Sequence, residues 1–261
     1  MPSFKSLILK KQERGEADEL VVLFSRDLGW IRGIAKNSRK SRIRFGGHLE
    51  PFSLVDVVLR LRRRDDLVWI DESHVIKGFL NIRSSPEKTA AASLFLEIAS
   101  AFLPGGPPDE RLFDFLGRVL DELDSSTTVN TLSLFFDEIR LLGILGFQPG
   151  FEICPICGTK LVPGDDVLFA VDHGGGIHRR CNTGDRPSFR LSPDTLAVLR
   201  KGSQAEPGVA GRLRLGSRGL EEIRRALSAF ERYIRGADLN TLLYMEKMAR
   251  WRKTPPGSGK R

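Results

Sequence analysis

Three cysteines and one histidine in the second half of the chain have the spacing of metal ligands. CPICG at 154–158 places Cys154 and Cys157 three positions apart, and GGGIHRRC at 174–181 places His178 and Cys181 in the same way. Two such knuckles bring four side chains to one tetrahedral ion, and three cysteines with one histidine are an established zinc ligand set. Because four protein ligands leave no position for a catalytic water, we expect a structural Zn²⁺ ion rather than a catalytic one.

Two alternatives to this ligand set remain open. His173 lies eight residues before Cys181 and is the rival fourth ligand. The other alternative is a degenerate site that no longer binds metal and holds its shape by packing. In either case, three cysteines with two of them in C-x-x-C are typical of a reduced compartment rather than of a disulfide framework.

Two catalytic motifs are matched only in part. His48 and Glu50 form the H-x-E of zinc nucleobase deaminases, but Ile153 stands where those enzymes have a proline before the C-x-x-C. The C-terminal GSGKR resembles part of a phosphate-binding P-loop, but Thr254 replaces its first glycine and Arg261 replaces its serine or threonine. The sequence therefore predicts no enzymatic activity.

The net charge of +8 is concentrated in one window of the chain. Residues 32–64 contain ten Lys or Arg against only Glu50 and Asp56, so this window carries the whole excess. A local excess of this kind is typical of a surface that binds polyanions, although a basic surface kept for solubility has the same composition. We expect contact with nucleic acid, with Trp30 and Phe45 as stacking groups. The basic residues expected to contact it are Arg32, Lys36, Arg39, Lys40, Arg42 and Arg44.

The first eighty residues predict a small β-barrel. Five runs rich in β-branched and aromatic residues are separated by turns, and several alternate apolar and polar side chains as a sheet with one buried face requires. The runs cover residues 6–11, 19–25, 29–36, 51–62 and 67–79. Five short strands fit an OB-type barrel, and an SH3-like barrel needs a similar number.

From residue 85 the hydrophobic period changes to that of helices. Ser85 precedes Pro86, a favourable first helical residue, and a second Ser-Pro pair begins at Ser192. Apolar stripes at helical spacing predict helices over 85–103, 109–123, 131–146, 192–202 and 219–251. No apolar run approaches the ~18 residues that cross a bilayer, and the N-terminus becomes charged too early for a secretory signal peptide. We therefore expect a cytoplasmic protein.

These elements together predict an α+β protein. Its fold would be an N-terminal OB-fold β-barrel followed by an α-helical domain with an inserted zinc-knuckle module. The expected boundaries are 1–82 for the barrel, 83–149 and 189–250 for the two parts of the helical domain, 150–188 for the zinc module and 251–261 for a disordered basic tail.

Three segments resemble the RecO family of bacterial recombination mediators. They are DLGWIRGIAKNSRKSRIRFGGHLEPFS at 27–53, DEIRLLGILGFQPGFEICPICG at 137–158 and FERYIRGADLNTLLYMEKM at 230–248. They follow the family's order over nearly the whole chain, and the middle segment resembles the passage into the family's zinc module. Family members with a full metal site have GG-x-x-C-x-x-C at the second knuckle, whereas this chain has His178 in place of the first cysteine of that pair.

The resemblance implies a non-enzymatic, nucleoid-associated mediator of DNA repair. It would bind single- and double-stranded DNA, anneal complementary strands coated with single-strand-binding protein and, with RecR, promote loading of RecA. The acidic, aromatic-ended tail of single-strand-binding protein would need an apolar groove rimmed by basic residues. The helical domain offers Arg140, Arg224, Arg225 and Arg232 for that rim. An RNA-binding protein of the ribosome or of RNA metabolism is the alternative, and a scaffold without nucleic-acid binding is the third.

Overall fold

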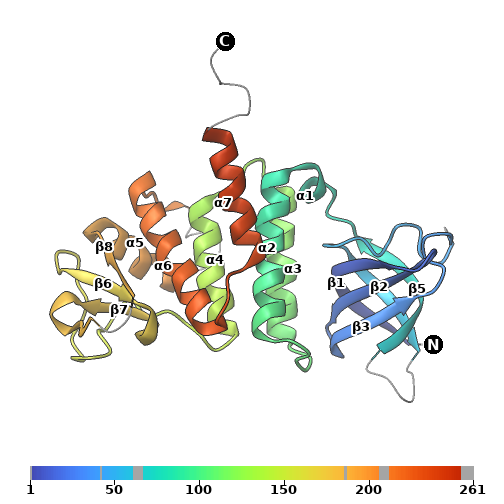
Figure 1. Ribbon diagram of the computed structural model, residues 1–261, viewed down its shortest axis with the longest axis horizontal. Coiled ribbons are helices and arrows are strands. Elements are labelled where there is room, and N and C mark those ends of the chain that lie inside the picture. Colours follow the sequence, from blue (N-terminus) through green and yellow to red (C-terminus); the bar gives the residue numbers. More distant parts are fainter. Residues whose placement is uncertain (1, 42, 61–66, 185–186, 206–211, 254–261) are drawn as a thin grey trace, which may run out of the picture. The chain divides into compact units, whose positions relative to one another are not determined.

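The computed structural model describes residues 2–41, 43–60, 67–184, 187–205 and 212–253, and the chain divides into two compact units. The first unit comprises Met1–Ala92 and Leu103–Thr127, and the second comprises Ser93–Phe102 and Thr128–Arg261 (Figure 1). Helix α2 (Pro86–Phe102) contributes its first part to one unit and its last part to the other. Within the described ranges, no helix is long and apolar enough to cross a membrane.

Five strands of the first unit close into a barrel in the order β1-β2-β3-β5-β4. β3 pairs with β5 in parallel, and the other neighbouring strands are antiparallel. The strands, at the blue end of the chain in Figure 1, are β1 (Ser3–Arg14), β2 (Asp18–Ser25), β3 (Gly29–Ala35), β4 (Leu54–Arg60) and β5 (Leu67–Lys77). The five expected strands are thus confirmed, and their closed arrangement is OB-like.

Alternate side chains of these strands fill the barrel with apolar groups, as the two-residue period of a strand requires. Val21, Val55 and Val57 are fully buried, and Ile70 of β5 is 2% exposed. Gly33 of β3 faces Ile70, and a Cβ atom added at Gly33 would lie 2.7 Å from the Ile70 side chain. The glycine therefore lets β3 and β5 pair closely enough to close the barrel.

The first unit also contains helices α1 (Leu80–Ser84) and α3 (Glu110–Ser125), in addition to the first part of α2. Helix α3 was expected, and its N-cap Asp109 accepts a hydrogen bond from the backbone N–H of Leu112 at 3.0 Å. Helix α1 was not expected, because five residues are too short to show helical periodicity. Its Arg83 donates hydrogen bonds to the carbonyl of Pro51 and the hydroxyl of Ser53, which holds the segment before β4.

Among its described residues, the second unit contains four further α-helices: α4 (Thr131–Ile144), α5 (Pro193–Gln204), α6 (Ser217–Arg235) and α7 (Asn240–Lys253). The expectation of one continuous helical stretch over 219–251 is wrong. Helix α6 ends at Gly236, which has a left-handed φ of 76°, and α7 begins four residues later. Glu97 of α2 accepts the backbone N–H groups of Asn240 at 2.8 Å and Thr241 at 2.7 Å, so a carboxylate caps the start of α7.

The expected C-terminal tail and the expected insert differ in part from the structure. Helix α7 extends to Lys253, so the first three residues of the segment 251–261 are helical, and 254–261 lie outside the described residues. The insert forms a sheet that was not predicted, in the order β7-β6-β8. Its strands are β6 (Val167–Ala170), β7 (Gly175–His178) and β8 (Ser188–Leu191), which are too short for a periodicity signal.

Two buried glutamates and one half-buried arginine lie together between the helices of the second unit. Glu138 of α4 is fully buried, and Arg224 of α6 donates two hydrogen bonds to its carboxylate at 3.1 and 2.7 Å. Glu231 of α6 is 1% exposed, and its carboxyl oxygens have no hydrogen-bond partner among the described residues. Burial, and then the negative charge of Glu138, raise the pKa of Glu231 well above its ordinary value, and the positive charge of Arg224 opposes this only in part.

We predict that Glu231 destabilises the fold as the pH rises. Above about pH 4.5 the unfolded state loses the proton of Glu231, whereas the folded state keeps it until the pH reaches the raised pKa. Over this pH range the free energy of unfolding should therefore fall as the pH rises, by at most ~1.4 kcal/mol per pH unit. Glu231→Gln is neutral at every pH, so its stability advantage over the wild type should grow as the pH rises above about 5. Urea unfolding followed by circular dichroism measures this difference. Glu221→Gln, on the exposed side of the same helix, is the control, and a pH-independent difference for Glu231→Gln would contradict the prediction.

Candidate functional site

The first pair of expected metal ligands lies in a tight turn. The backbone N–H of Cys154 donates to the carbonyl of Thr159, and the N–H of Gly158 donates to the carbonyl of Cys154, both at 2.9 Å. Gly158 has a φ of 70°, a left-handed conformation that glycine adopts without strain. The turn reverses the chain so that Cys154 lies opposite Thr159. The thiols of Cys154 and Cys157 therefore lie close together.

The second pair lies at the end of a strand. His178 is the last residue of β7 and pairs with Val167 of β6. A single turn of 3₁₀ helix, Arg179–Cys181, follows and brings Cys181 back toward the imidazole. The ligand atoms of the four residues all lie within 4.8 Å of one another. The structure therefore brings together all four residues of the expected set, and these residues could hold one metal ion.

A carboxylate orients the histidine of this cluster. The Nδ1 atom of His178 lies 3.4 Å from the Sγ atom of Cys157, and the Nε2 atom lies 3.3 Å from the Oδ2 atom of Asp165. An Nε2–H that donates to Asp165 leaves the lone pair of Nδ1 directed at the three sulfur atoms. Metal-binding histidines are held in this way by a carboxylate on the far nitrogen. His173 is not part of the cluster and instead lies 4.0 Å from Asp172 on an exposed turn.

The environment of the thiols favours the thiolate form that binds metals. The hydroxyl and backbone N–H of Thr159 lower the pKa of Cys157 to about 5. Burial of Cys154 opposes its ionisation, but backbone N–H groups, first that of Cys157, outweigh burial and lower its pKa. Desolvation, and then the neighbouring sulfurs, raise the pKa of Cys181, because a third negative charge without a cation is unfavourable. A divalent cation would offset the repulsion between the three thiolates. The cluster is therefore better suited to binding a metal ion than to packing as part of a core.

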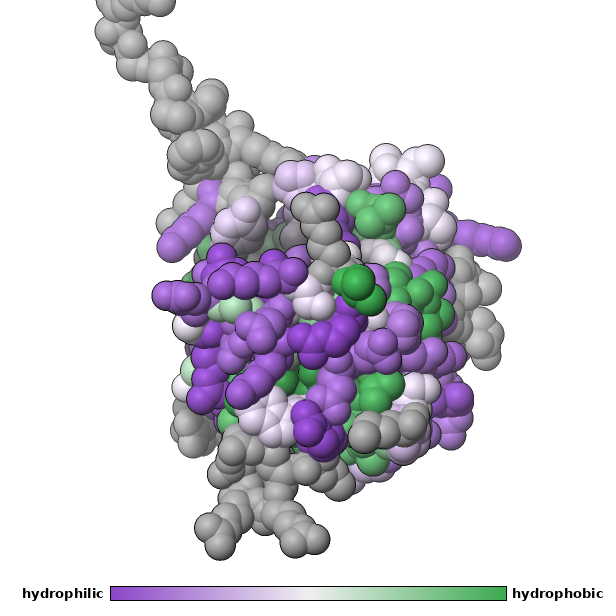
Figure 2. Space-filling model, turned by 90° about the vertical axis from the view of Figure 1, so that its right-hand side faces the viewer, coloured by the Kyte–Doolittle hydropathy of each residue, from purple (hydrophilic) through white to green (hydrophobic). Residues whose placement is uncertain are grey.

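The basic residues of the barrel lie on its outer surface and on the loop that follows β3. Arg32 is exposed on β3, and Lys36, Arg39 and Lys40 are exposed at the start of the loop. Arg44 is half-buried, because its guanidinium donates to the carbonyl of Lys36 at 3.0 Å. Figure 2 shows strongly hydrophilic side chains over much of the face of the molecule turned to the viewer. Arg42, the sixth expected DNA-binding cation, lies outside the described residues.

The chain was compared with known proteins and protein families. The N-terminal model of recombination protein O matches residues 1–79, and the C-terminal model of the same protein matches residues 83–242. The chain belongs to the RecO family. The DNA repair protein RecO of Dehalococcoides mccartyi (strain ATCC BAA-2266 / KCTC 15142 / 195) is 31% identical over 94% of this chain and 95% of its own length. That of Rubrobacter xylanophilus is 34% identical over 86% of this chain and 88% of its own length, and that of Syntrophus aciditrophicus is 29% identical over 94% and 95%.

The structure of this RecO-family chain corrects one of the two stacking residues expected from the sequence. Phe45 is 1% exposed and lies in the core of the barrel, where no base can reach it. The loop that carries the expected cations turns Phe45 inward because a buried aromatic ring contributes more to the core than any neighbouring residue of the loop. Trp30 is half-buried on the outer face of β3, with its ring centroid 5.1 Å from that of Phe24, and its role in stacking stays a prediction.

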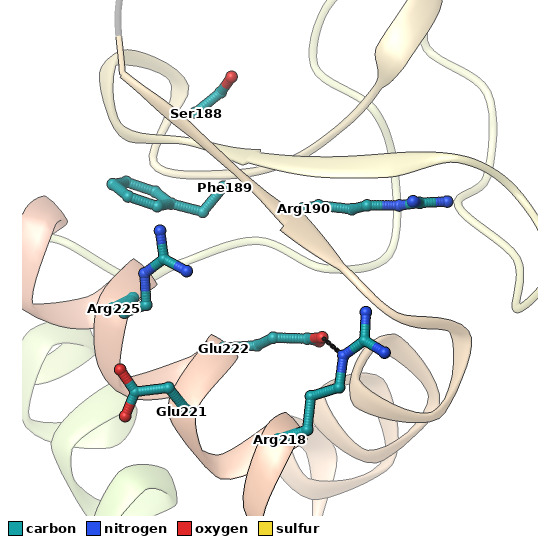
Figure 3. A pocket seen from close by; sticks show the side chains of 7 residues that line it. All are labelled: Ser188, Phe189, Arg190, Arg218, Glu221, Glu222 and Arg225. Atoms are coloured by element: carbon teal, nitrogen blue, oxygen red, sulfur yellow. Dashed lines mark ion pairs between the residues drawn. The ribbon is translucent and has the colours of Figure 1, made fainter.

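A pocket lies between strand β8 and helix α6 of the second unit. It has a volume of about 390 Å³. Figure 3 shows the ring of Phe189 from β8 facing the guanidinium of Arg225 from α6, and these two groups are 5.7 Å apart. Arg218 and Glu222, which lie one turn apart on α6, form an ion pair at 3.4 Å that lines the pocket. The complete lining is Ser188, Phe189, Arg190, Arg218, Glu221, Glu222 and Arg225.

Two residues of these sites were missed from the sequence. Asp165 lies thirteen residues before His178 in no recognised motif, and only the pairing of β6 with β7 brings the two together. Trp69 belongs to an expected strand, but the alternation of that run does not say whether its ring is on the outside. It lies on the outer face, with the Nζ atom of Lys36 4.7 Å from its ring centroid.

We predict that His178, and not His173, holds the metal. The wild type and His173→Ala should each retain about one equivalent of zinc by elemental analysis, and His178→Ala should lose most of it. Asp165→Ala should keep the four ligands but bind the ion about 10- to 100-fold more weakly in a chelator competition, because the imidazole loses its orienting partner. Equal zinc content in His178→Ala and the wild type would contradict the assignment.

Proposed function

We propose that this RecO-family protein binds single- and double-stranded DNA and anneals complementary strands that carry single-strand-binding protein. With RecR, it helps to load RecA on such coated DNA, and it makes or breaks no covalent bond. The observation that carries the proposal is the set of exposed cations on the barrel. Arg32, Lys36 and Lys40 form no ion pair with a described residue, so their charges are available to an anion.

Phosphate repulsion is the main obstacle when two strands approach each other. A basic surface binds phosphates, releases the condensed counterions and lowers this repulsion. The interaction is with the backbone and is therefore independent of sequence, which suits a protein that must act wherever DNA is damaged. The barrel surface has the required sign of charge on one strand and the loop that follows it.

We assign the metal as Zn²⁺, held by Cys154, Cys157, His178 and Cys181. Three thiolates and one imidazole within reach of one ion are the donor set that zinc prefers. The ion would supply local folding free energy, on the order of 10 kcal/mol, to a module whose strands have only four residues each. The residues of this chain orient the ligands, and the module contributes shape rather than chemistry.

We predict that removing the three unpaired barrel cations weakens DNA binding uniformly. The variant Arg32→Ala/Lys36→Ala/Lys40→Ala should bind all single-stranded sequences more weakly. Its slope of log affinity against log salt concentration should become shallower by about 2, because each of the three lost phosphate contacts reduces the magnitude of the slope by about 0.7. The same variant should lose annealing of labelled strands coated with single-strand-binding protein. Fluorescence anisotropy measures binding, and strand pairing measured by energy transfer follows annealing without any nucleotide.

The matched control removes three exposed cations from the second unit, as Lys201→Ala/Arg212→Ala/Lys247→Ala. It should leave the salt slope of single-strand binding unchanged. An unchanged slope in the barrel variant would remove the electrostatic basis of the proposal. Tighter binding of structured RNA than of single-stranded DNA at the same salt concentration would favour an RNA-binding protein instead.

We propose further that the tail of single-strand-binding protein binds in the pocket between β8 and α6. Three of the four candidate arginines are engaged elsewhere: Arg224 with Glu138, Arg140 with Asp137 and Arg232 with Asp238. Arg225 has no ion pair with a described residue and lies beside the half-buried ring of Phe189. An apolar ring next to an unpaired guanidinium is what an acidic peptide that ends in an aromatic residue requires.

We predict that Arg225→Ala weakens binding of a labelled tail peptide by about 10-fold or more, as expected for the loss of a charge-assisted contact. Phe189→Ala should have a similar effect through lost apolar contact. Arg235→Ala, at the C-terminal end of the same helix, is the control and should bind like the wild type. Peptide affinity equal to that of the wild type in both pocket variants would exclude this pocket as the tail site.

A further inference from the structure

The seam between β3 and β5 carries an aromatic side chain on the outer face of the barrel. Trp69 of β5 is paired with Ile34 of β3 on one side and with Arg60 of β4 on the other. Its neighbours in the strand, Val68 and Ile70, pack against the barrel core, so the indole of Trp69 points outward. Ile34 beneath it is 3% exposed, whereas the indole itself is half-buried and keeps contact with solvent.

Cationic side chains surround this indole. Arg32 and Lys36 lie two positions before and after Ile34, which places them diagonally across from Trp69 on the same face. The Nζ atom of Lys36 lies 4.7 Å from the ring centroid, a cation–π contact. Arg60, directly opposite Trp69, donates to Asp71 at 2.8 Å, so it is partly neutralised while Arg32 and Lys36 are not.

An aromatic face among unpaired cations is the arrangement that binds unpaired nucleotides. The ring stacks on a base, and the cations contact the phosphates on either side of it. Neither of the two aromatic residues expected from the sequence offers this combination. Phe45 is in the barrel core, and the Nε1 atom of Trp30 is buried while its ring packs on Phe24.

We propose that Trp69 is the stacking platform for one unpaired nucleobase of the bound single strand. The inference rests on the proposed function, because it places a base on the surface that is proposed to bind DNA. On binding, the ammonium of Lys36 exchanges its contact with the indole for contact with a phosphate, and the base takes its place on the ring. A base in a duplex is stacked on its neighbours, so this site favours single strands over double strands.

The test compares a normal oligonucleotide with one of the same length that lacks bases. Trp69→Leu keeps apolar cover over Ile34 but has no π face, and it should bind single-stranded DNA about 5- to 100-fold more weakly than the wild type. Binding of the abasic chain, which offers only phosphates and sugars, should be the same for both proteins. Trp69→Phe should recover part of the affinity, and thermal unfolding should show that the variants are folded.

Tryptophan fluorescence gives a second measurement that a structural role alone would not move. The chain has three tryptophans, so Trp30→Phe/Trp251→Phe leaves Trp69 as the single emitter. Its emission should be quenched by the normal oligonucleotide and not by the abasic one. If Trp69→Leu binds both chains like the wild type, or if both chains quench alike, the stacking site is excluded and DNA binding by the cations still stands. If the wild type binds neither chain, the proposed function and this inference both fail.

Discussion

The parallel pairing of β3 with β5 is the constraint on which the first unit depends. Without it the five strands would form an open sheet with two unpaired edges, which is unfavourable for a small β protein. The pairing is possible because Gly33 leaves room for the side chain of Ile70. It also sets the composition of the outer surface, since Arg32, Lys36 and Trp69 become neighbours only across this seam. A hydrogen bond also holds the loop that follows β3 to β5, because the backbone N–H of Ser73 donates to the carbonyl of Arg44 at 3.0 Å.

The module with the four clustered residues is built differently. Its three strands have only four residues each, and Val167, Phe169 and Ile177 of β6 and β7 are buried. The pairing of β6 with β7 ends at His178 and so places the second knuckle beside the turn that carries the first. This arrangement explains how a histidine can replace a cysteine at the second knuckle. The imidazole is longer than a thiol, but the strand end and the carboxylate of Asp165 hold it with Nδ1 toward the sulfurs. A substitution at this position thus keeps the ligand count when a second group orients the new ligand.

The sequence was most informative where a pattern reports a local requirement. Alternating strands, Ser-Pro helix starts and the x₂ spacing of ligands each depend on a few adjacent residues. The first two predicted their elements correctly, and the third predicted which four side chains lie together, while their binding of a metal stays a prediction. The errors concern features that depend on distant residues. Phe45 and Trp69 have similar aromatic side chains, and only barrel closure decides that the first faces inward and the second outward. The break at Gly236 was missed because apolar spacing continues across it, and the cap from Glu97 that permits it lies far away in the chain.

Arg224 of the second unit and Arg32 of the barrel differ in the charge that they could offer to a ligand. In the second unit, Arg224 is bound by the buried carboxylate of Glu138, and releasing it to bind a ligand would leave that charge buried without a partner. Such an arginine contributes to a specific fold and has little charge to offer. On the barrel, Arg32 and Lys36 lie on a solvated surface, where losing a partner has no comparable energetic cost. Side chains that can exchange water for phosphate without destabilising the fold are suited to transient binding, so Arg32 and Lys36 are better suited than Arg224 to the proposed DNA contact.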